Sequence, residues 1–225
     1  MDSNLKKLAG EAAMHYIMDG MIVGLGTGST THFFIKKIGE EIKKGLDIIS
    51  IPTSLTTEKL AKSLDIPLSN FSEYQTIDIT VDGADQVDPE LNLIKGGGGA
   101  LVREKIVASC SKKLIIVVDE SKMVKKLSYP LPIEVIPFGW EATLKKLEYI
   151  GLNPVIRKDK EIFVSDNGNF IIDCQYKEIT EELETRINMI PGVVENGIFR
   201  NMADEIVVGT KKGLKKIKKT NDRKR

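Results

Sequence analysis

The sequence predicts an α/β protein that combines a doubly wound, mostly parallel sheet of Rossmann-like type with a smaller α+β domain of ferredoxin-like type. Short apolar runs alternate with helical patterns over residues 1–130, which is the arrangement of a parallel sheet. The run at 114–118 is apolar throughout, as expected for a central strand covered on both faces. Beyond Tyr129-Pro130-Leu131-Pro132 the order becomes strand, helix, two strands, helix and strand, which is typical of a ferredoxin-like unit.

These patterns divide the chain into two expected domains, a Rossmann-like domain with the candidate site (1–130 and 206–225) and a ferredoxin-like domain (131–205). In the large domain, helices are expected over 3–18, after residue 31, from 53 or 54 to about 64, and over 100–109, with strands over 21–25, 48–51, 67–68, 77–81, 91–94 and 114–118. In the small domain, strands are expected over 133–136, 154–157 and 193–198, a hairpin over 162–172, and helices over 140–150 and 179–189. A strand at 206–209 returns to the large domain, before a short helix and a basic tail.

The first helix has an apolar pattern that indicates which side is buried. Leu5, Leu8, Ala12 and Ile17 share roughly one face, and Asp19-Gly20 ends the helix. The second helix carries its own stripe at Phe34, Ile35, Ile38 and Ile42.

Composition excludes several classes of protein. The 225 residues carry a formal net charge of +1, but residues 211–225 hold nine basic side chains and one acid, so the preceding 210 residues have 24 basic and 31 acidic groups, a net charge of −7. This basic tail has no interleaved aromatic residues, so a nucleic-acid partner is not indicated. No apolar segment is long enough to span a membrane, and Cys110 and Cys174 lie far apart without metal or redox spacing. We therefore expect a cytoplasmic protein with reduced cysteines and no membrane partner.

A loop rich in glycine and hydroxyl groups follows the first strand. Gly26-Thr27-Gly28-Ser29-Thr30-Thr31 leads directly into a helix, an order that aims backbone N–H groups and the helix dipole at a phosphate. The loop lacks the lysine of a Walker P-loop, and Asp47 is misplaced for gripping the ribose of a dinucleotide. A plain turn capped by Ser or Thr and a sugar-phosphate cradle both remain open, and we favour the cradle.

The stretch VDGADQVDPELNLIKGGGGALVREK, residues 81–105, concentrates the remaining candidate residues. Asp82 and Asp85 follow an expected strand, Lys95 precedes Gly96-Gly97-Gly98-Gly99, and Glu104 lies in the first turns of a helix. Such a glycine run costs roughly 0.5 to 1 kcal/mol per residue relative to alanine, which indicates close backbone approach to a ligand. On the helical wheel Glu104 lies opposite Val102 and Ile106, so it faces either solvent or a cleft.

Each of these residues also has a structural explanation when taken alone. Turn aspartates bond their own backbone, a helix dipole stabilises an early glutamate, and Lys95 or Lys122 could be a surface lysine. The Asp119-Glu120-Ser121 segment could cap the next segment of the chain. Because the carboxyl ends of parallel strands share one sheet edge, however, these groups should meet there and suit an anionic, polyhydroxylated substrate. His15 and His32 are isolated, so no metal site is expected.

Several motifs together resemble one family. The segments VGLGTGSTTHFF, SIPTSLTTEKLAKSLDIPL, VDGADQVDPELNLIKGGGGALVREK, VVDESKMV, LPIEVIPFGW and ADEIVVGT occur in an order similar to that of type A ribose-5-phosphate isomerases. The resemblance extends to about residue 217. It implies interconversion of D-ribose 5-phosphate and D-ribulose 5-phosphate in the pentose phosphate pathway, without a metal or organic cofactor, and it implies a homodimer or homotetramer.

The resemblance also implies roles for individual residues. Glu104 would be the base that moves a proton between C2 and C1, while Asp82 and Asp85 would bind sugar hydroxyls and assist ring opening. Lys95 and the glycine amides would stabilise the developing oxyanion. The substrate-binding residues implied are Thr27, Gly28, Ser29, Thr30, Asp82, Gly83, Ala84, Asp85, Lys95, Gly96, Gly97, Gly98 and Lys122. Catalytic roles would fall to Glu104, Asp82, Asp85 and Lys95.

Some features depart from the family pattern, and other functions stay open. Gln86 stands where the family often has Glu, and Thr31 adds a hydroxyl with no assigned role. One alternative is a sugar-phosphate sensor domain, which would not need Glu104, and another is a coenzyme A transferase, which would form a glutamyl thioester. Three aromatic residues are candidates for a subunit interface by their expected exposure: Phe138, Trp140 and Phe199.

Overall fold

The computed structural model describes residues 2–219, and its centre is a six-stranded sheet in the order β13-β12-β6-β3-β1-β2. Neighbouring strands are parallel except for the antiparallel pair β12–β13. The strands are β1 Ile22–Leu25, β2 Ile49–Pro52, β3 Ile79–Asp82, β6 Leu114–Asp119, β12 Glu205–Thr210 and β13 Gly213–Lys218. The predicted return of the chain at 206–209 to the large sheet is confirmed, because β12 pairs with β6.

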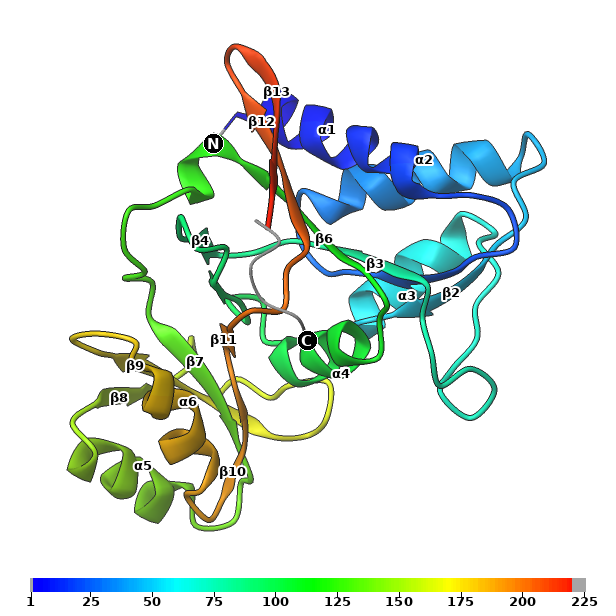
Figure 1. Ribbon diagram of the computed structural model, residues 1–225. Helices are drawn as coiled ribbons and strands as arrows, with labels where there is room; N and C mark the ends of the chain where they lie inside the picture. The colour runs from blue at the N-terminus through cyan, green and yellow to red at the C-terminus, as the bar shows by residue number, and fades with distance from the viewer. Residues whose placement is uncertain (1, 220–225) are drawn as a thin grey trace.

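Helices cover both faces of this sheet, as Figure 1 shows. The helices of the large domain are α1 Ser3–Ala12, the 3₁₀ helix η1 Ala13–Tyr16, α2 Thr31–Ile42, α3 Leu55–Ser63 and α4 Leu101–Ser109. Ile115 and Val117 of β6 pack in the core beneath α1 and α2, whereas Ile116 and Val118 pack in a second core on the opposite face. The apolar run at 114–118 is therefore buried on both faces, as the sequence predicts.

The segment at 91–94 does not join the parallel sheet, contrary to the prediction. A separate antiparallel sheet in the order β11-β5-β4 is built from β4 Gln86–Val87, β5 Leu93–Ile94 and β11 Ile198–Phe199. Asp88 closes the β4–β5 turn by accepting hydrogen bonds from the backbone N–H groups of Glu90 and Asn92. The chain therefore folds back immediately after β4, and β5 pairs with its own hairpin partner.

A four-stranded antiparallel sheet in the order β10-β7-β9-β8 forms the smaller part of the molecule. Its elements are β7 Leu131–Val135, α5 Trp140–Tyr149, β8 Asn153–Ile156, β9 Phe170–Gln175, α6 Glu181–Asn188 and β10 Val193–Asn196. This strand and helix order confirms the predicted α+β unit of ferredoxin-like type. In Figure 1 the unit lies beside the central sheet, with α4 between them. The exact domain boundaries stay a prediction.

The end of the chain differs from the prediction. Residues 213–218 form strand β13, where a short helix was expected. The turn before it requires Gly213, whose φ is +112°, and Thr210 donates a hydrogen bond to the Gly213 carbonyl across the turn. Ile217 then packs against the core beneath β12. Residues 220–225 of the basic tail lie outside the described residues.

The apolar face expected for the first helix is buried only in part, since Ala12 and Ile17 pack against the large core. Ala9 and Ala13 are fully buried, whereas Leu8 is 37% exposed. The reason is the close approach of α1 to α2, since a Cβ on Gly10 would lie 2.5 Å from the Thr30 carbonyl oxygen. Small side chains, and not the largest apolar ones, therefore face the neighbouring helix.

The three aromatic interface candidates differ in exposure, and Trp140 is only partly buried. Phe199 is fully buried, and Trp140 packs edge-on against Phe170 inside the small unit. Phe138 is the most exposed of the three, at 93%.

Candidate active site

The candidate site lies where the sheet changes direction. The chain moves from β1 to β2 on one side and then returns to place β3 and β6 on the other side of β1. The carboxyl ends of β1 and β3 thus flank a crevice of the kind in which open α/β sheets bind ligands. A cleft of about 120 Å³ lies there, lined by Thr27, Gly28, Ser29, Thr30, Gly83, Ala84, Asp85, Lys95, Gly96, Gly97, Gly98, Ala100, Glu104 and Lys122. Of the residues expected in the site, Asp82 alone lies behind this lining.

The loop after β1 is held by Asp82 from below. Asp82 Oδ1 accepts hydrogen bonds from the backbone N–H groups of Thr27 at 3.0 Å and Gly83 at 2.7 Å. Gly26 must be glycine, because a Cβ there would lie 2.2 Å from the same carboxylate oxygen. Thr31 donates its hydroxyl to the Gly28 carbonyl at 2.9 Å, which supplies the role that the sequence left open. The loop is therefore fixed before any ligand binds.

The hydroxyl of Thr27 points away from the cleft. Its Oγ1 lies 2.8 Å from the hydroxyl oxygens of both Thr53 and Ser54, at the start of α3. Ser54 also caps α3 by accepting a hydrogen bond from the Thr57 N–H, as expected for residue 53 or 54. Thr27 thus ties the loop to α3, and both its hydroxyl and its N–H already take part in hydrogen bonds within the protein.

Lys6 lies beside the loop after β1 and lines a neighbouring hollow with Gly28 and Ser29, a contact that sequence reasoning missed. Its ammonium lies 2.8 Å from the hydroxyl of Ser29, so α1 brings a cation to the loop after β1. No local pattern indicates this contact, since Lys6 and Ser29 are 23 residues apart and meet only because α1 packs on α2.

A buried charge cluster forms the floor of the cleft. Lys95 Nζ lies 2.9 Å from Glu104 Oε1, 3.0 Å from Asp82 Oδ2 and 2.6 Å from the Gly83 carbonyl oxygen. All three side chains are at most 4% exposed. Two ammonium protons donate hydrogen bonds, to Glu104 Oε1 and to the Gly83 carbonyl, and the contact with Asp82 Oδ2 is an ion pair. Glu104 Oε2 accepts no hydrogen bond from any residue within 2–219, although it is buried.

Burial changes the proton affinity of this cluster. It raises the pKa of Glu104 from 4.5 to about 8, an effect that Lys95 opposes and that the Asp82 and Asp85 carboxylates strengthen. Burial also raises the pKa of Asp82, against Lys95 and two backbone N–H groups. For Lys95, burial acts to lower the pKa, but the two carboxylates outweigh it and the pKa lies above its usual range. The cluster therefore keeps a fixed cation beside a glutamate that can gain or lose a proton near neutral pH.

In α4 the buried face is not the face that carries Val102 and Ile106 but the one opposite to it. Ile106 is 47% exposed, whereas Glu104 and Val107 are buried. Of the two environments predicted for Glu104, solvent or a cleft, the structure gives the cleft.

The glycine run bends around the carboxylate of Asp85. Asp85 Oδ2 accepts a hydrogen bond from Gly97 N at 2.7 Å, and a Cβ at Gly97 would lie 2.5 Å from Asp85 Oδ1. Gly96 and Gly99 have φ values of +95° and +80°, which other residues rarely adopt. The run is therefore a tight turn that exposes backbone to the cleft, as its composition predicts.

Residues after β6 and β4 complete the surroundings. Lys122 lies in the 3₁₀ helix η2 Glu120–Lys122 and lines the cleft. Asp119 caps this helix by accepting hydrogen bonds from Ser121, so its structural explanation is confirmed. Gln86 Oε1 accepts hydrogen bonds from the backbone N–H groups of Ser128 and Tyr129, at 2.7 and 2.8 Å. Gln86 thus holds the segment that leads into the small unit.

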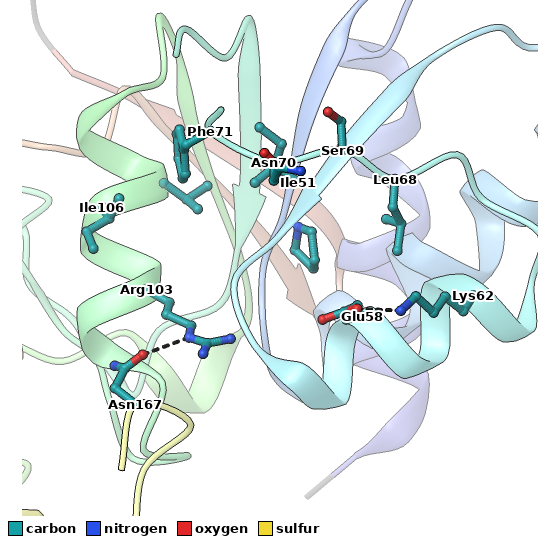
Figure 2. Close-up of a pocket in the computed structure, with 12 residues that line it drawn as sticks. Ile51, Glu58, Lys62, Leu68, Ser69, Asn70, Phe71, Arg103, Ile106 and Asn167 are labelled. Carbon is teal, nitrogen blue, oxygen red and sulfur yellow. Dashed lines mark hydrogen bonds and ion pairs between the residues drawn. The ribbon is translucent and has the colours of Figure 1, made fainter. Parts of the chain in front are cut away.

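A second hollow, of about 560 Å³, lies on the other side of α4, and Figure 2 shows the residues that line it. Its cations are already paired, because Lys62 forms an ion pair with Glu58 and Arg103 donates to Asn167 Oδ1. None of the residues expected in the site lines it. Compared with this hollow, the cleft beside Glu104 has a carboxylate oxygen without a hydrogen-bond partner among residues 2–219, and exposed glycine backbone.

Within residues 2–219, no three His, Cys, Asp or Glu side chains are grouped to hold a metal ion. In the same part of the chain, no helix is long and apolar enough to cross a membrane.

Comparison with known proteins decides the family. The family model described as ribose 5-phosphate isomerase A (phosphoriboisomerase A) matches residues 49–213. The chain belongs to the ribose-5-phosphate isomerase A family. A ribose-5-phosphate isomerase A from Bacillus mycoides is 50% identical over 217 residues, covering 94% of this chain and 98% of its own length. One from Pyrococcus horikoshii is 45% identical over 225 residues, covering 96% and 98%.

Solved structures of this isomerase family share the fold. Ribose 5-phosphate isomerase A from Methanocaldococcus jannaschii has a TM-score of 0.92 at 44% identity, covering 97% of this chain and 100% of its own. A D-ribose-5-phosphate isomerase solved in complex with phospho-erythronic acid has a TM-score of 0.93, with the same identity and coverage. The family resemblance drawn from the motifs is thus confirmed, and the sensor-domain alternative has no support.

Proposed function

We propose that this protein interconverts D-ribose 5-phosphate and D-ribulose 5-phosphate, and that Glu104 is the base. The observation that carries the assignment is the free Oε2 of a buried Glu104 at the cleft, held 2.9 Å from Lys95 through Oε1. A base works best when its pKa lies near the working pH, and the pKa of about 8 meets this condition.

The proton transfers follow from this placement. With the open-chain aldose bound, Glu104 removes the proton from C2, the C–H electron pair forms the C1–C2 double bond, and the carbonyl oxygen at C1 takes the negative charge. A proton then passes from the hydroxyl at C2 to the oxygen at C1. Glu104 returns its proton to C1 while the carbonyl forms at C2, so the protein ends in its starting state. A single base on one side of the enediolate suffices for both steps.

Lys95 supports the negative intermediate chiefly through its charge. Two of its protons donate to Glu104 and to the Gly83 carbonyl, and the ammonium forms an ion pair with Asp82, so the protein already occupies most of its donor capacity. A fixed cation in a buried site interacts strongly with a nearby anion even without contact. The donors left for contact are backbone N–H groups of the glycine run, and such donors are typically worth about 2.7 to 4 kcal/mol each at a developing oxyanion.

The phosphate end of the substrate suits the loop at residues 27–30. Gly28 and Ser29 are exposed at the cleft, and Lys6 supplies a cation at Ser29. Lys122 lines the same cleft from η2 and is assigned to the substrate as well. Asp85 faces the cleft from the opposite wall and is assigned, with Asp82, to the sugar hydroxyls and to ring opening.

The wider setting is proposed from the family. We place the protein in the cytoplasm and the pentose phosphate pathway, as a homodimer or homotetramer, with no metal or organic cofactor. The exposed ring of Phe138 is available to a subunit contact. Analytical ultracentrifugation of the purified protein measures the oligomeric state directly.

The test is conversion of ribose 5-phosphate to the ketose by purified protein, with and without EDTA. We expect turnover that EDTA does not change, a Glu104→Gln variant that binds the sugar phosphate without converting it, and a Glu58→Gln control with ordinary activity. Glu58 is a surface residue paired with Lys62 on α3. Binding of the sugar phosphate by wild type without any conversion would reject the isomerase assignment, and loss of activity in EDTA would reject the metal-free mechanism.

A further inference from the structure

Arg157, which directly follows β8 in the small unit, reaches across to the glycine run of the site. Its Nη1 donates to the carbonyl oxygens of Gly96 and Gly97, each at 3.1 Å. Its Nε and Nη2 donate hydrogen bonds to the two carboxylate oxygens of Asp173 on β9. The guanidinium is therefore fixed on one side by a bidentate ion pair and bridges two successive carbonyls on the other.

The two carbonyls determine where the neighbouring N–H groups point. In a trans peptide the C=O and the following N–H point in opposite directions. The peptide between Gly96 and Gly97 is held at both ends, by Arg157 at its carbonyl and by Asp85 at its N–H. The next peptide is held by Arg157 at the Gly97 carbonyl, which leaves the N–H of Gly98 on the opposite side.

Gly98 is the residue at which this orientation matters. It lines the cleft beside Glu104, and a Cβ built on it would meet nothing within 4 Å. Its N–H donates no hydrogen bond to any of residues 2–219. The orientation imposed by Arg157 thus gives the cleft an unoccupied backbone donor.

The hairpin that follows Arg157 is braced against the large domain. The ring of Phe163 packs on Gly99, where a Cβ would lie 2.4 Å from the ring, and Arg157 lies over the same ring at 5.6 Å. Further along, Asp166 accepts a hydrogen bond from Leu55 N, and Asn167 accepts one from Arg103, a contact visible in Figure 2. The hairpin therefore contacts the large domain both near its start, at Phe163, and at its turn, at Asp166 and Asn167.

We propose that Arg157 is a positioning residue: through the Gly96 and Gly97 carbonyls it orients the Gly98 N–H toward the oxyanion that develops on the substrate. The inference rests on the proposed isomerase function. It makes the small unit a working part of the catalytic site, because Asp173 and Arg157 both belong to it. Because a preformed donor stabilises the transition state more than the bound sugar, loss of Arg157 should lower kcat more than it changes KM.

Two variants test the proposal, Arg157→Ala and Arg157→Lys, with Arg200→Ala as the control. Arg200 also pairs with one acid, Glu181, but touches no glycine of the run. We expect Arg157→Ala to lower kcat about 10- to 100-fold with KM changed less than threefold, because misplaced catalytic groups cost rates of this size. Lysine cannot bridge two carbonyls and grip a carboxylate together, so Arg157→Lys should recover little, whereas millimolar guanidinium should partly restore Arg157→Ala.

Amide hydrogen exchange gives a readout that does not depend on turnover. Gly97 N–H and Gly99 N–H are bonded to Asp85 and to the Gly96 carbonyl, so both should exchange faster in Arg157→Ala and unchanged in Arg200→Ala. Unchanged exchange would overturn the proposal, and so would a loss confined to KM or a kcat within twofold of wild type. Absence of turnover in the wild type would reject the proposed function instead, and the exchange result would still decide the role of Arg157 in orienting the run.

Discussion

Replacing Glu104 by Gln should separate the catalytic role of this residue from its cost to stability. The glutamate is 4% exposed, and its pKa is raised from 4.5 to about 8. The folded protein therefore holds a proton on Glu104 between these pH values, where the unfolded chain has already released it. Because the native state binds more protons, the free energy of unfolding falls as the pH rises through this window.

The size of the effect can be worked out from the same values. At about 1.4 kcal/mol for each pH unit between 4.5 and about 8, the wild type should lose at most about 5 kcal/mol from this group. Asp82 shares the Lys95 ammonium, so part of the loss belongs to the carboxyl pair. Between pH 5 and pH 9 only about three of these pH units are sampled, so we expect a difference of about 2 to 4 kcal/mol between the wild type and Glu104→Gln.

Urea denaturation at pH 5, 7 and 9 measures this difference, with Glu58→Gln as the surface control. The Glu104→Gln curve should stay nearly flat where the wild type declines, and the control should follow the wild type. Activity should show the opposite preference: kcat/KM of the wild type should rise with pH up to about 8, since the base acts deprotonated. Parallel stability curves for wild type and Glu104→Gln, within about 0.5 kcal/mol, would refute the raised pKa.

Three further changes have definite expected outcomes. Lys6→Ala removes the cation at the phosphate loop and should raise KM about tenfold while kcat changes little, measured by steady-state kinetics. Gly99→Ala forces a Cβ to 2.4 Å from Phe163 and should destabilise by about 2 kcal/mol more than Gly168→Ala, which has a similar φ in open space, measured by urea titration. Gln86→Ala removes the acceptor of the Ser128 and Tyr129 N–H groups, so their hydrogen exchange should become faster and the free energy of unfolding should fall by about 1 kcal/mol. Unchanged exchange of these two N–H groups would contradict this role of Gln86.

The sequence alone was sufficient for the fold class and for the expectation that the candidate site residues gather at one edge of the sheet. Hydrophobic periodicity is a local property, so the parallel strands, most helices and the α+β unit could be identified from it. The rule that strand carboxyl ends share one edge then brought Thr27, Asp82 and Glu104 together without coordinates. Glycine-rich composition likewise indicated the tight turn at residues 96–99.

Contacts between distant segments were decided by the tertiary structure. Leu8 is exposed and Ala9 is buried because α2 approaches α1 closely, and no pattern within α1 carries that distance. The strand at 213–218 forms because β12 offers an open sheet edge, which overrides the local preference for a helix. Lys6 at Ser29, Gln86 at the linker and Arg157 at the glycine run join residues 23, 42 and 60 or more positions apart. Hydrogen bonds between such distant residues depend on packing geometry. The residues that contact the loops of the candidate site from other parts of the chain could therefore be found only in the folded molecule.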